Sequence, residues 1–191
     1  MLSTVVALST VSSMAFAQCN LLTNPGFEDA GGSLSGWSEI WGNAFASTPW
    51  TDNIFRTGSA AGKAFGPFWQ PGGTSGFGQA FAPTAGMVYE LSGYSYVSSA
   101  DPLFATDPCL RNHMVAKIEF YDGLSGTAMS SNEIVIADDN TPTDQWHRFS
   151  VSAPAPPGAV QVKALFIFVQ PDELDAGAAF VDDVLFCESE P

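Results

Sequence analysis

Short runs of alternating apolar and polar residues, separated by turn-forming residues, occupy most of the chain. In residues 113–122, apolar side chains alternate with charged ones, which is typical of a strand with one buried face. Residues 87–97 also have a period of two, with Tyr94 and Tyr96 opposite the apolar face. Residues 164–169 are continuously apolar, as expected of a strand covered on both faces.

These patterns predict about nine strands and no convincing amphipathic helix. Many short strands separated by Gly- and Pro-rich turns indicate an all-β fold, a two-sheet antiparallel jelly-roll β-sandwich. The expected strands are residues 20–28, 56–65, 79–81, 87–97, 113–122, 134–136, 146–151, 160–169 and 178–186.

Two segments, residues 29–53 and 66–78, combine many Gly and Pro residues with a heavy load of Trp and Phe. Such composition predicts irregular backbone, and a loop cannot bury that many rings within itself. We therefore expect some of these rings to cap the core and others to face solvent.

The beginning and the end of the chain are expected to lie side by side. Residues 24–28 form a Pro-Gly turn followed by the carboxylate of Glu28, and residues 180–186 place Asp182 inside an otherwise apolar strand. A carboxylate in such a strand is costly unless it is paired or binds a metal. A hard cation such as calcium, held by Glu28, Asp182 and turn carbonyls, would satisfy it.

Composition limits the partners of the chain. Its 191 residues, 46% hydrophobic, suffice for one domain, which we place at residues 18–191. With 20 acidic and 6 basic residues the net charge is −14, which disfavours nucleic acid and anionic membranes. Neutral polymers and cations remain as partners.

The first residues resemble a targeting segment. Residues 2–17 are uncharged, mostly small or apolar, and end in Ala15-Phe16-Ala17, so we expect residues 1–17 to be a signal peptide cleaved before Gln18 and the protein to be secreted. The alternative is a buried first strand or helix, although a run rich in Ser and Thr makes a poor helix. No later segment has the roughly 18 apolar residues of a membrane span.

Five motifs together resemble a known family. They are Asn20-Leu21-Leu22-Thr23-Asn24-Pro25-Gly26-Phe27-Glu28, Gly36-Trp37, Thr57-Gly58-Ser59-Ala60-Ala61, Asp144-Gln145-Trp146-His147-Arg148-Phe149 and Val181-Asp182-Asp183-Val184. The chain is similar to the galactose-binding-like jelly-roll domains that act as carbohydrate-binding modules beside xylanases and cellulases. The resemblance implies a secreted, non-catalytic domain that binds a polysaccharide or another glycan.

The resemblance also implies a structural calcium between the first and last strands. The matching positions are Glu28 and Asp182, with Gly26 and the turn around Ser59 as further oxygen donors. Oxygen-only ligands suit calcium better than zinc. The alternative is that both carboxylates accept hydrogen bonds from turn amides.

Three cysteines are present in the chain: Cys19, Cys109 and Cys187. If the first and last strands are antiparallel neighbours, Cys19 faces Cys187, and a disulfide between them follows. Cys109 would then be left without a partner. The alternative is that all three are small apolar residues with free thiols.

Aromatic side chains are the candidates for sugar binding, because flat rings cover the apolar faces of pyranoses while polar neighbours bind the hydroxyl groups. For each ring the alternative is core packing or loop anchoring. By resemblance, Trp37 and Trp146 pack inward. The candidate rings are Trp41, Trp50, Trp69, Tyr94 and Tyr96, with Gln70, Arg111 and Asn112 as polar neighbours.

Catalysis is not expected. The chain has no nucleophile-elbow serine, no HExxH, no paired CxxC and no phosphate-binding glycine loop. Its many carboxylates do not by themselves form a glycosidase pair. The competing interpretation is a free-standing exported protein with a structural or adhesive role at cell-surface or matrix components and no glycan binding.

Overall fold

The computed structural model describes residues 19–68, 72–107 and 109–191, which form two antiparallel sheets of five strands each. The first sheet has the order β1-β4-β9-β6-β7 and the second the order β2-β3-β10-β5-β8. A 3-10 turn, η1 (Asp29–Gly31), precedes them. The strands are β1 (Glu39–Trp41), β2 (Asn43–Ser47), β3 (Ala61–Phe65), β4 (Gly73–Phe81), β5 (Val88–Val97), β6 (His113–Tyr121), β7 (Ser130–Asp138), β8 (His147–Pro154), β9 (Gln161–Gln170) and β10 (Ala178–Ser189).

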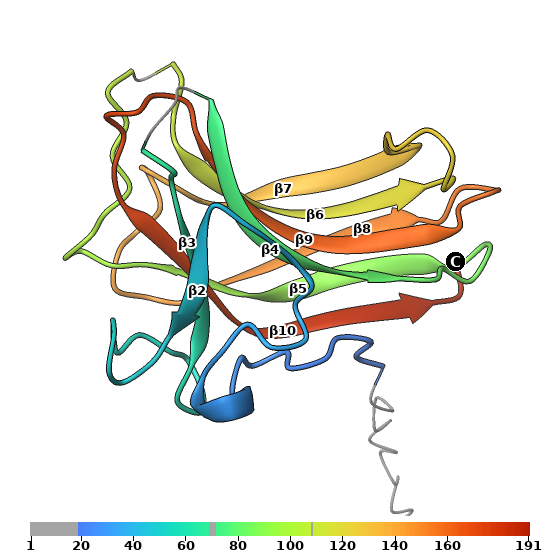
Figure 1. Ribbon diagram of the computed structural model, residues 1–191, viewed down its shortest axis with the longest axis horizontal. Coiled ribbons are helices and arrows are strands. Elements are labelled where there is room, and N and C mark those ends of the chain that lie inside the picture. The colour runs from blue at the N-terminus through green and yellow to red at the C-terminus, as the bar shows by residue number, and fades with distance from the viewer. Residues whose placement is uncertain (1–18, 69–71, 108) are drawn as a thin grey trace, which may run out of the picture.

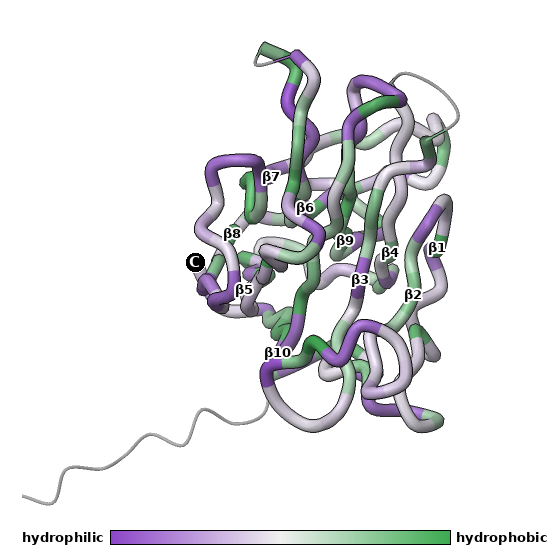
Figure 2. Tube along the Cα trace, turned by 90° about the vertical axis from the view of Figure 1, so that its left-hand side faces the viewer, coloured by the Kyte–Doolittle hydropathy of each residue, from purple (hydrophilic) through white to green (hydrophobic). Residues whose placement is uncertain are grey.

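The two sheets pack face to face as a β-sandwich. Figure 2 shows both layers, with β7 and β8 at one side and β1 and β2 at the other. The core between the sheets is aromatic: Phe77, Phe166 and Trp37 contact one another with ring centroids 5.2–5.9 Å apart. Figure 1 shows β4 bending upward at the left, so the first sheet is strongly curved.

The predicted jelly-roll β-sandwich is confirmed, and the alternating strands face as expected. Leu91 and Ile118, for example, are fully buried in the core, whereas Lys117 lies on the outer face.

Two strands were missed. Residues 29–53 were expected to be loop but contain β1, which is only three residues long, and β2, which consists mostly of small or polar residues.

The start of β4 was also missed, because its glycines resemble a loop in the sequence. In the structure they make room for neighbouring side chains. A Cβ at Gly76 would lie 2.6 Å from the ring of Trp41, and one at Gly78 would lie 2.4 Å from Leu165. The glycines are therefore required by packing on the outer face of the first sheet.

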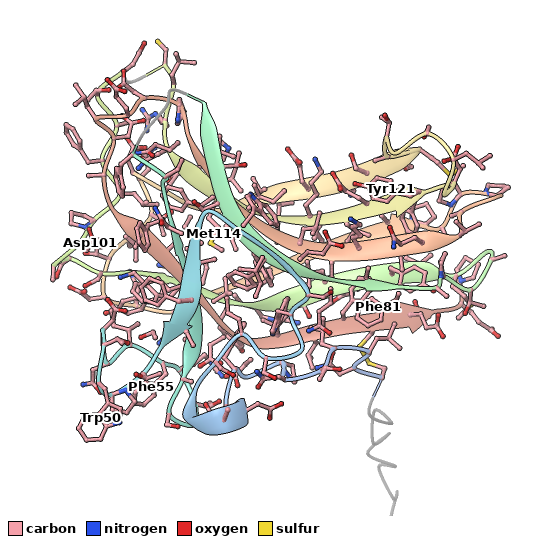
Figure 3. The ribbon with its side chains drawn as sticks, viewed as in Figure 1. Trp50, Phe55, Phe81, Asp101, Met114 and Tyr121 are labelled. Carbon is pink, nitrogen blue, oxygen red and sulfur yellow. A yellow bond between two sulfur atoms is a disulfide. The ribbon has the colours of Figure 1, made fainter. Side chains whose placement is uncertain are left out.

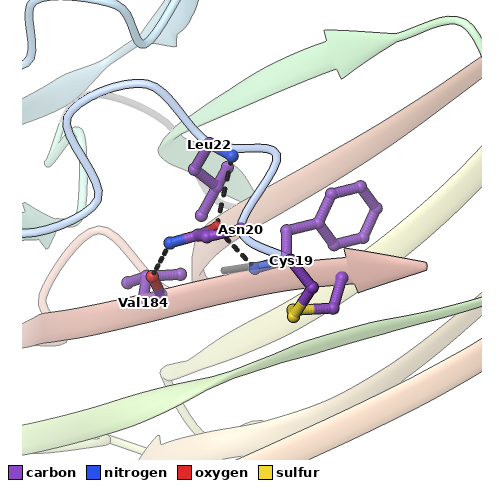
Figure 4. Close-up of a disulfide and its surroundings, with 6 residues drawn as sticks. Cys19, Asn20, Leu22 and Val184 are labelled. Carbon is purple, nitrogen blue, oxygen red and sulfur yellow. Dashed lines mark hydrogen bonds between the residues drawn. A yellow bond between two sulfur atoms is a disulfide. The ribbon is translucent and has the colours of Figure 1, made fainter. Parts of the chain in front are cut away.

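The two ends of the chain lie side by side, as expected, although the first segment forms no regular strand. The Leu21 amide donates to the Phe186 carbonyl at 2.8 Å. The Asn20 side chain donates to the Val184 carbonyl (2.9 Å) and accepts from the Phe186 amide (2.9 Å), as Figure 4 shows in part. One asparagine side chain thus replaces part of a strand ladder.

The predicted disulfide between Cys19 and Cys187 is confirmed (Figure 4). The two Cα atoms are 5.1 Å apart, and 168 positions separate the residues in the sequence. In the chain-entropy model such a long loop contributes about 4–5 kcal/mol to stability. Cys109 is a free, exposed thiol.

The sequence also predicted a signal peptide and no membrane-spanning segment. The predicted signal peptide, residues 1–17, lies outside the described residues. Within the part of the chain that the structure describes, no helix is long and apolar enough to cross a membrane.

Candidate functional site

An apolar row crosses the outer face of the first sheet. The strand register aligns one residue from each of the five strands: Trp41, Gly76, Ile167, Val115 and Val135. Because neighbouring strands are about 4.8 Å apart, the row is about 19 Å long.

Trp41 begins this row in a fixed orientation. Its indole Nε1 donates to Thr74 Oγ1 at 3.1 Å, and its ring contacts the backbone of β4 where Gly76 has no side chain. The side chain is half-buried, so part of the ring stays open to solvent. The result is an aromatic platform held against the sheet at one end of the row.

A hollow of about 260 Å³ lies at the other end of the row, lined by Cys109, Arg111, His113, Val135 and Asp138. Val135 is 56% exposed and belongs to both the row and the hollow. The Arg111 guanidinium pairs with a neighbouring carboxylate, Asp139, at 2.7 Å, and the Arg111 carbonyl lies 2.8 Å from Nδ1 of His113. The apolar row thus leads into a site with hydrogen-bonding groups.

Paired charges border the row along the same face. The Lys163 ammonium is 3.1 Å from Glu39, and the Lys117 ammonium is 3.1 Å from Glu119 and 2.9 Å from Glu133. These pairs leave the face with little net charge, while their oxygens and ammonium groups can still bond hydroxyl groups.

Tyr121 stands at the edge of this face (Figure 3), with the Lys163 ammonium 5.1 Å from its ring centre. Burial, together with the neighbouring carboxylate of Glu119, raises the pKa of Tyr121 to about 12. Burial disfavours the charged form of Lys117, but hydrogen bonds to Glu133 and Glu119 outweigh it and raise the pKa of Lys117. The phenol is therefore neutral and the lysine charged at any physiological pH.

The outer face of the second sheet holds more rings, but most of them contact the protein itself. Lys63 lies at its centre, with its ammonium 5.2–5.5 Å from the ring centres of Phe45, Phe65 and Phe180. The same ammonium pairs with Asp52 at 2.6 Å. Asp52 comes from the turn after β2, so this ion pair fastens that turn to the sheet.

The two tyrosines predicted from the sequence lie on this second face. The Arg56 guanidinium covers the ring of Tyr94 at 3.6 Å from its centre. Tyr96 contacts Trp146, with ring centroids 5.1 Å apart, and its hydroxyl donates to Asp144 at 3.2 Å. Trp146 was expected to pack inward, which is wrong, because it joins Tyr96 outside the core.

The structure does not gather the predicted sugar-binding rings into one surface. Tyr94 and Tyr96 lie on the second sheet, and Trp41 lies on the first. Trp50 is 92% exposed at the tip of the turn after β2 (Figure 3). Trp69, like the predicted polar neighbour Gln70, lies outside the described residues.

The other two predicted polar neighbours, Arg111 and Asn112, lie in different environments. Arg111 lines the hollow at the end of the apolar row, whereas Asn112 is fully buried and donates to the Ala176 carbonyl at 2.6 Å. Asn112 therefore faces the interior, and its expected surface role is wrong. The row itself was missed, although Val115 and Val135 at outward positions of alternating strands are a signal that could have found it.

The predicted calcium residues meet at the turn before β3. Glu28 Oε1 accepts from the amides of Ser59 and Ala60, both at 2.9 Å, and Glu28 Oε2 accepts from Ser59 Oγ at 2.7 Å. Asp182 Oδ2 accepts from the amides of Arg56 (2.7 Å) and Thr57 (3.1 Å). The same turn thus holds both carboxylates.

This arrangement matches the hydrogen-bonded alternative better than a calcium cage. One oxygen of each carboxylate already accepts two N–H groups, which uses both of its lone pairs. Among residues 19–68, 72–107 and 109–191, no group of three His, Cys, Asp or Glu side chains is placed to hold a metal. Burial raises the pKa of Asp182 to about 6, against the lowering effect of the amide hydrogen bonds. Calcium at Gly26, Glu28, Ser59 and Asp182 stays a prediction.

Comparison with solved structures identifies the fold. No protein-family model matches the chain, and no curated protein matches it by sequence. A family 61 carbohydrate-binding module in complex with β-1,4-galactotriose is 17% identical, with a TM-score of 0.54 over 89% of this chain and 99% of that one. The CBM22-1 xylan-binding domain of Paenibacillus barcinonensis Xyn10C is 14% identical, with a TM-score of 0.54 over 87% of this chain and 92% of that one.

The same fold also occurs within larger proteins. The enzymatically active domain of tailspike protein 4 from bacteriophage CBA120 is 17% identical, with a TM-score of 0.56 over 90% of this chain. The matched part makes up only 22% of that protein, so the chain corresponds to a fraction of it. At these identities the likeness shows the fold, a jelly roll of the carbohydrate-binding-module type.

Proposed function

We propose that this chain is a non-catalytic domain that binds a neutral polysaccharide along the outer face of its first sheet. The observation that carries the proposal is the apolar row that begins at Trp41 and ends in the hollow beside Arg111. A straight row about 19 Å long suits several consecutive sugar units better than one small ligand.

Binding would combine stacking with directed hydrogen bonds. The half-exposed ring of Trp41 covers the C–H face of one pyranose. The accessible aliphatic side chains of Ile167 and Val135 extend that contact along the polymer, whereas Val115 between them is buried. Polar groups on the same face flank the row and can bond the hydroxyl groups of the sugar. They are Arg111 and the ion pair of Lys117 with Glu133. A shallow contact of this kind buries little area, so affinity is expected to be modest.

Charge supports a neutral ligand. The net charge of −14 repels polyanions at long range. On the face itself, three glutamates, Glu39, Glu119 and Glu133, surround two lysines, Lys117 and Lys163. Both lysines are therefore already paired, and the surplus of glutamates disfavours the carboxylates of an acidic polysaccharide.

The fold supports a polysaccharide as the ligand class. Of the solved structures with this fold, one contains β-1,4-galactotriose and another is a xylan-binding domain. A disulfide that joins the ends of the chain also supports export to an oxidising compartment.

Affinity electrophoresis tests the proposal. We expect retardation by at least one of xylan, β-galactan, β-glucan and mannan, and we expect Trp41→Ala to weaken binding about tenfold with nearly unchanged melting. Trp50→Ala is the matched control, since that tryptophan is exposed but lies away from the row. No retardation by any polymer, or equal loss in both variants, would contradict the proposal and favour a structural or adhesive role.

Calcium at the seam between the ends of the chain is a separate proposal. Calorimetric melting with and without a chelator tests it, because an ion bound only to the folded state raises the melting temperature. A lower melting temperature after chelation would support calcium at Glu28 and Asp182. Unchanged melting would leave the turn amides as the partners of both carboxylates.

A further inference from the structure

A second, smaller pocket opens on the outer face of the second sheet, across the sandwich from the Trp41 row. Its volume is about 190 Å³, and it is lined by Lys63, Phe65, Phe68, Asp101 and Gly177. These residues come from β3, from the segment after it, from the loop after β5 and from the residue before β10. Figure 3 shows Asp101 at the left-hand edge of the molecule.

Two rings form the apolar side of the pocket. Phe65 and Phe68 have centroids 5.9 Å apart and planes tilted by 32°. Phe68 is 45% exposed, yet its backbone has a φ of 58°, which is strained for a phenylalanine. Residues in such conformations persist where the surroundings enforce them, often at ligand-binding sites.

A buried glutamine holds Phe68 in this conformation. Gln170 is fully buried, its Oε1 accepts from the Phe68 amide at 2.8 Å, and its Nε2 donates to the Asp175 carbonyl at 2.6 Å. The exposed ring is therefore positioned by the core and not by contacts of its own side chain alone. A ring fixed in this way loses little entropy when a ligand stacks on it.

The polar side of the pocket offers both a donor and an acceptor. Lys63 has three N–H donors, and the structure commits one of them to Asp52. Asp101 is exposed and contributes carboxylate oxygens at the opposite side. With Asp52 and Asp101 against a single lysine, the formal charge around the pocket is −1, which disfavours an anionic ligand.

We propose that this pocket binds one neutral pyranose unit, stacked on Phe68 and Phe65 and hydrogen-bonded through its hydroxyl groups to Lys63 and Asp101. The site does not depend on the Trp41 row, since it lies on the other sheet and shares no residue with it. If both surfaces bind, one chain holds two glycan segments on opposite faces.

Titration of the ¹⁵N-labelled protein with simple glycosides tests the pocket directly. Methyl β-glucoside, methyl β-galactoside and methyl β-xyloside are the neutral probes, and methyl β-glucuronide is the anionic one. We expect at least one neutral glycoside to shift the amide signals of Lys63 and Gly177, with the glucuronide about tenfold weaker or inactive. No shift at these amides, or equal binding of the glucuronide, would overturn the proposal.

Variants separate this pocket from the proposed polymer site. Phe68→Ala should abolish the shifts at Gly177, while Phe104→Ala, which removes another exposed phenylalanine that does not line the pocket, should preserve them. Trp41→Ala should leave these shifts unchanged and affect only signals of the first sheet, such as that of Gly76. Shifts that survive Phe68→Ala, or that vanish with Trp41→Ala, would contradict a separate site.

Discussion

The two outer faces of this sandwich use their aromatic residues in opposite ways. On the first sheet one indole lies against a glycine, and the part of the ring that stays open to solvent begins an apolar row across the five strands. On the second sheet, Lys63 sits among three phenylalanines, and Arg56 covers Tyr94. The number of rings on a face therefore says less about binding than what each ring already touches.

The contrast follows from the connections at the ends of the strands. The turn after β2 folds over the second sheet and is fastened there by the pair between Asp52 and Lys63. The next turn, before β3, bonds Asp182 through two backbone amides. On the first sheet, by contrast, Lys117 and Lys163 pair with glutamates of the sheet's own strands.

Replacing the central lysine of the second face should have the largest effect. Lys63→Met leaves Asp52 without its cation and removes three contacts between ammonium and rings, so we expect a loss of about 4 kcal/mol of unfolding free energy. Lys163→Met on the first face is the control, because its pair is more exposed and contributes about 1 kcal/mol or less. Urea unfolding measures both. Equal losses would show that the two faces are not organised differently.

The buried carboxylate on the second face should make stability depend on pH. The pKa of Asp182 is raised by burial to about 6 in the folded state, above its ordinary value, so the protonated form is favoured by folding. The associated stability is present at about pH 4 and is lost as pH rises through about 6, amounting to at most about 3 kcal/mol. Thermal melting between pH 4 and 7 measures this effect.

A matched variant assigns the pH dependence to this residue. Asp182→Asn is expected to be less stable at pH 4, because its single side-chain oxygen cannot accept both from the Arg56 and Thr57 amides, which donate to one oxygen of Asp182, and from the Asp183 amide, which donates to the other. It should, however, flatten the change between pH 4 and 7. The same slope in the variant would show that other carboxylates cause it.

On the first face the glycine beneath Trp41 should matter both for stability and for binding. Gly76→Ala would place a Cβ 2.3 Å from the Phe166 carbonyl oxygen and 2.6 Å from the indole, so the ring must move. We expect a loss of about 2 kcal/mol in urea unfolding and weaker retardation by the polysaccharide that binds the wild type. Gly86→Ala, at a loop glycine with open space around it but a φ of 82°, should lose some stability through backbone strain and yet retain full binding. If Gly76→Ala bound the polysaccharide as tightly as the wild type does, the position of the indole would not matter for binding.

The sequence was sufficient for the sandwich, because alternation in β5 and β6 and the apolar run in β9 report burial directly. It also predicted that the two ends lie side by side, since Cys19 could be matched with Cys187 near the end of β10, but the hydrogen bonds of Asn20 were not foreseen. It could not separate the two faces. Tyr94 and Trp41 are equally aromatic in sequence, and only the fold shows that Arg56 covers one and a glycine supports the other.

The smallest expected effect gives the most direct test of that distinction. Tyr94→Ala removes a ring of the kind that sequence favours for sugar stacking, but one whose face Arg56 already occupies. We therefore expect a slight loss of stability and no change in polysaccharide retardation, in contrast to Trp41→Ala. Because Arg56 also pairs with Asp183, removing the ring leaves the guanidinium held in place. If Tyr94→Ala weakened binding as much as Trp41→Ala, the polysaccharide would have to contact Tyr94 itself, and a ring covered by the guanidinium of Arg56 could still take part in binding.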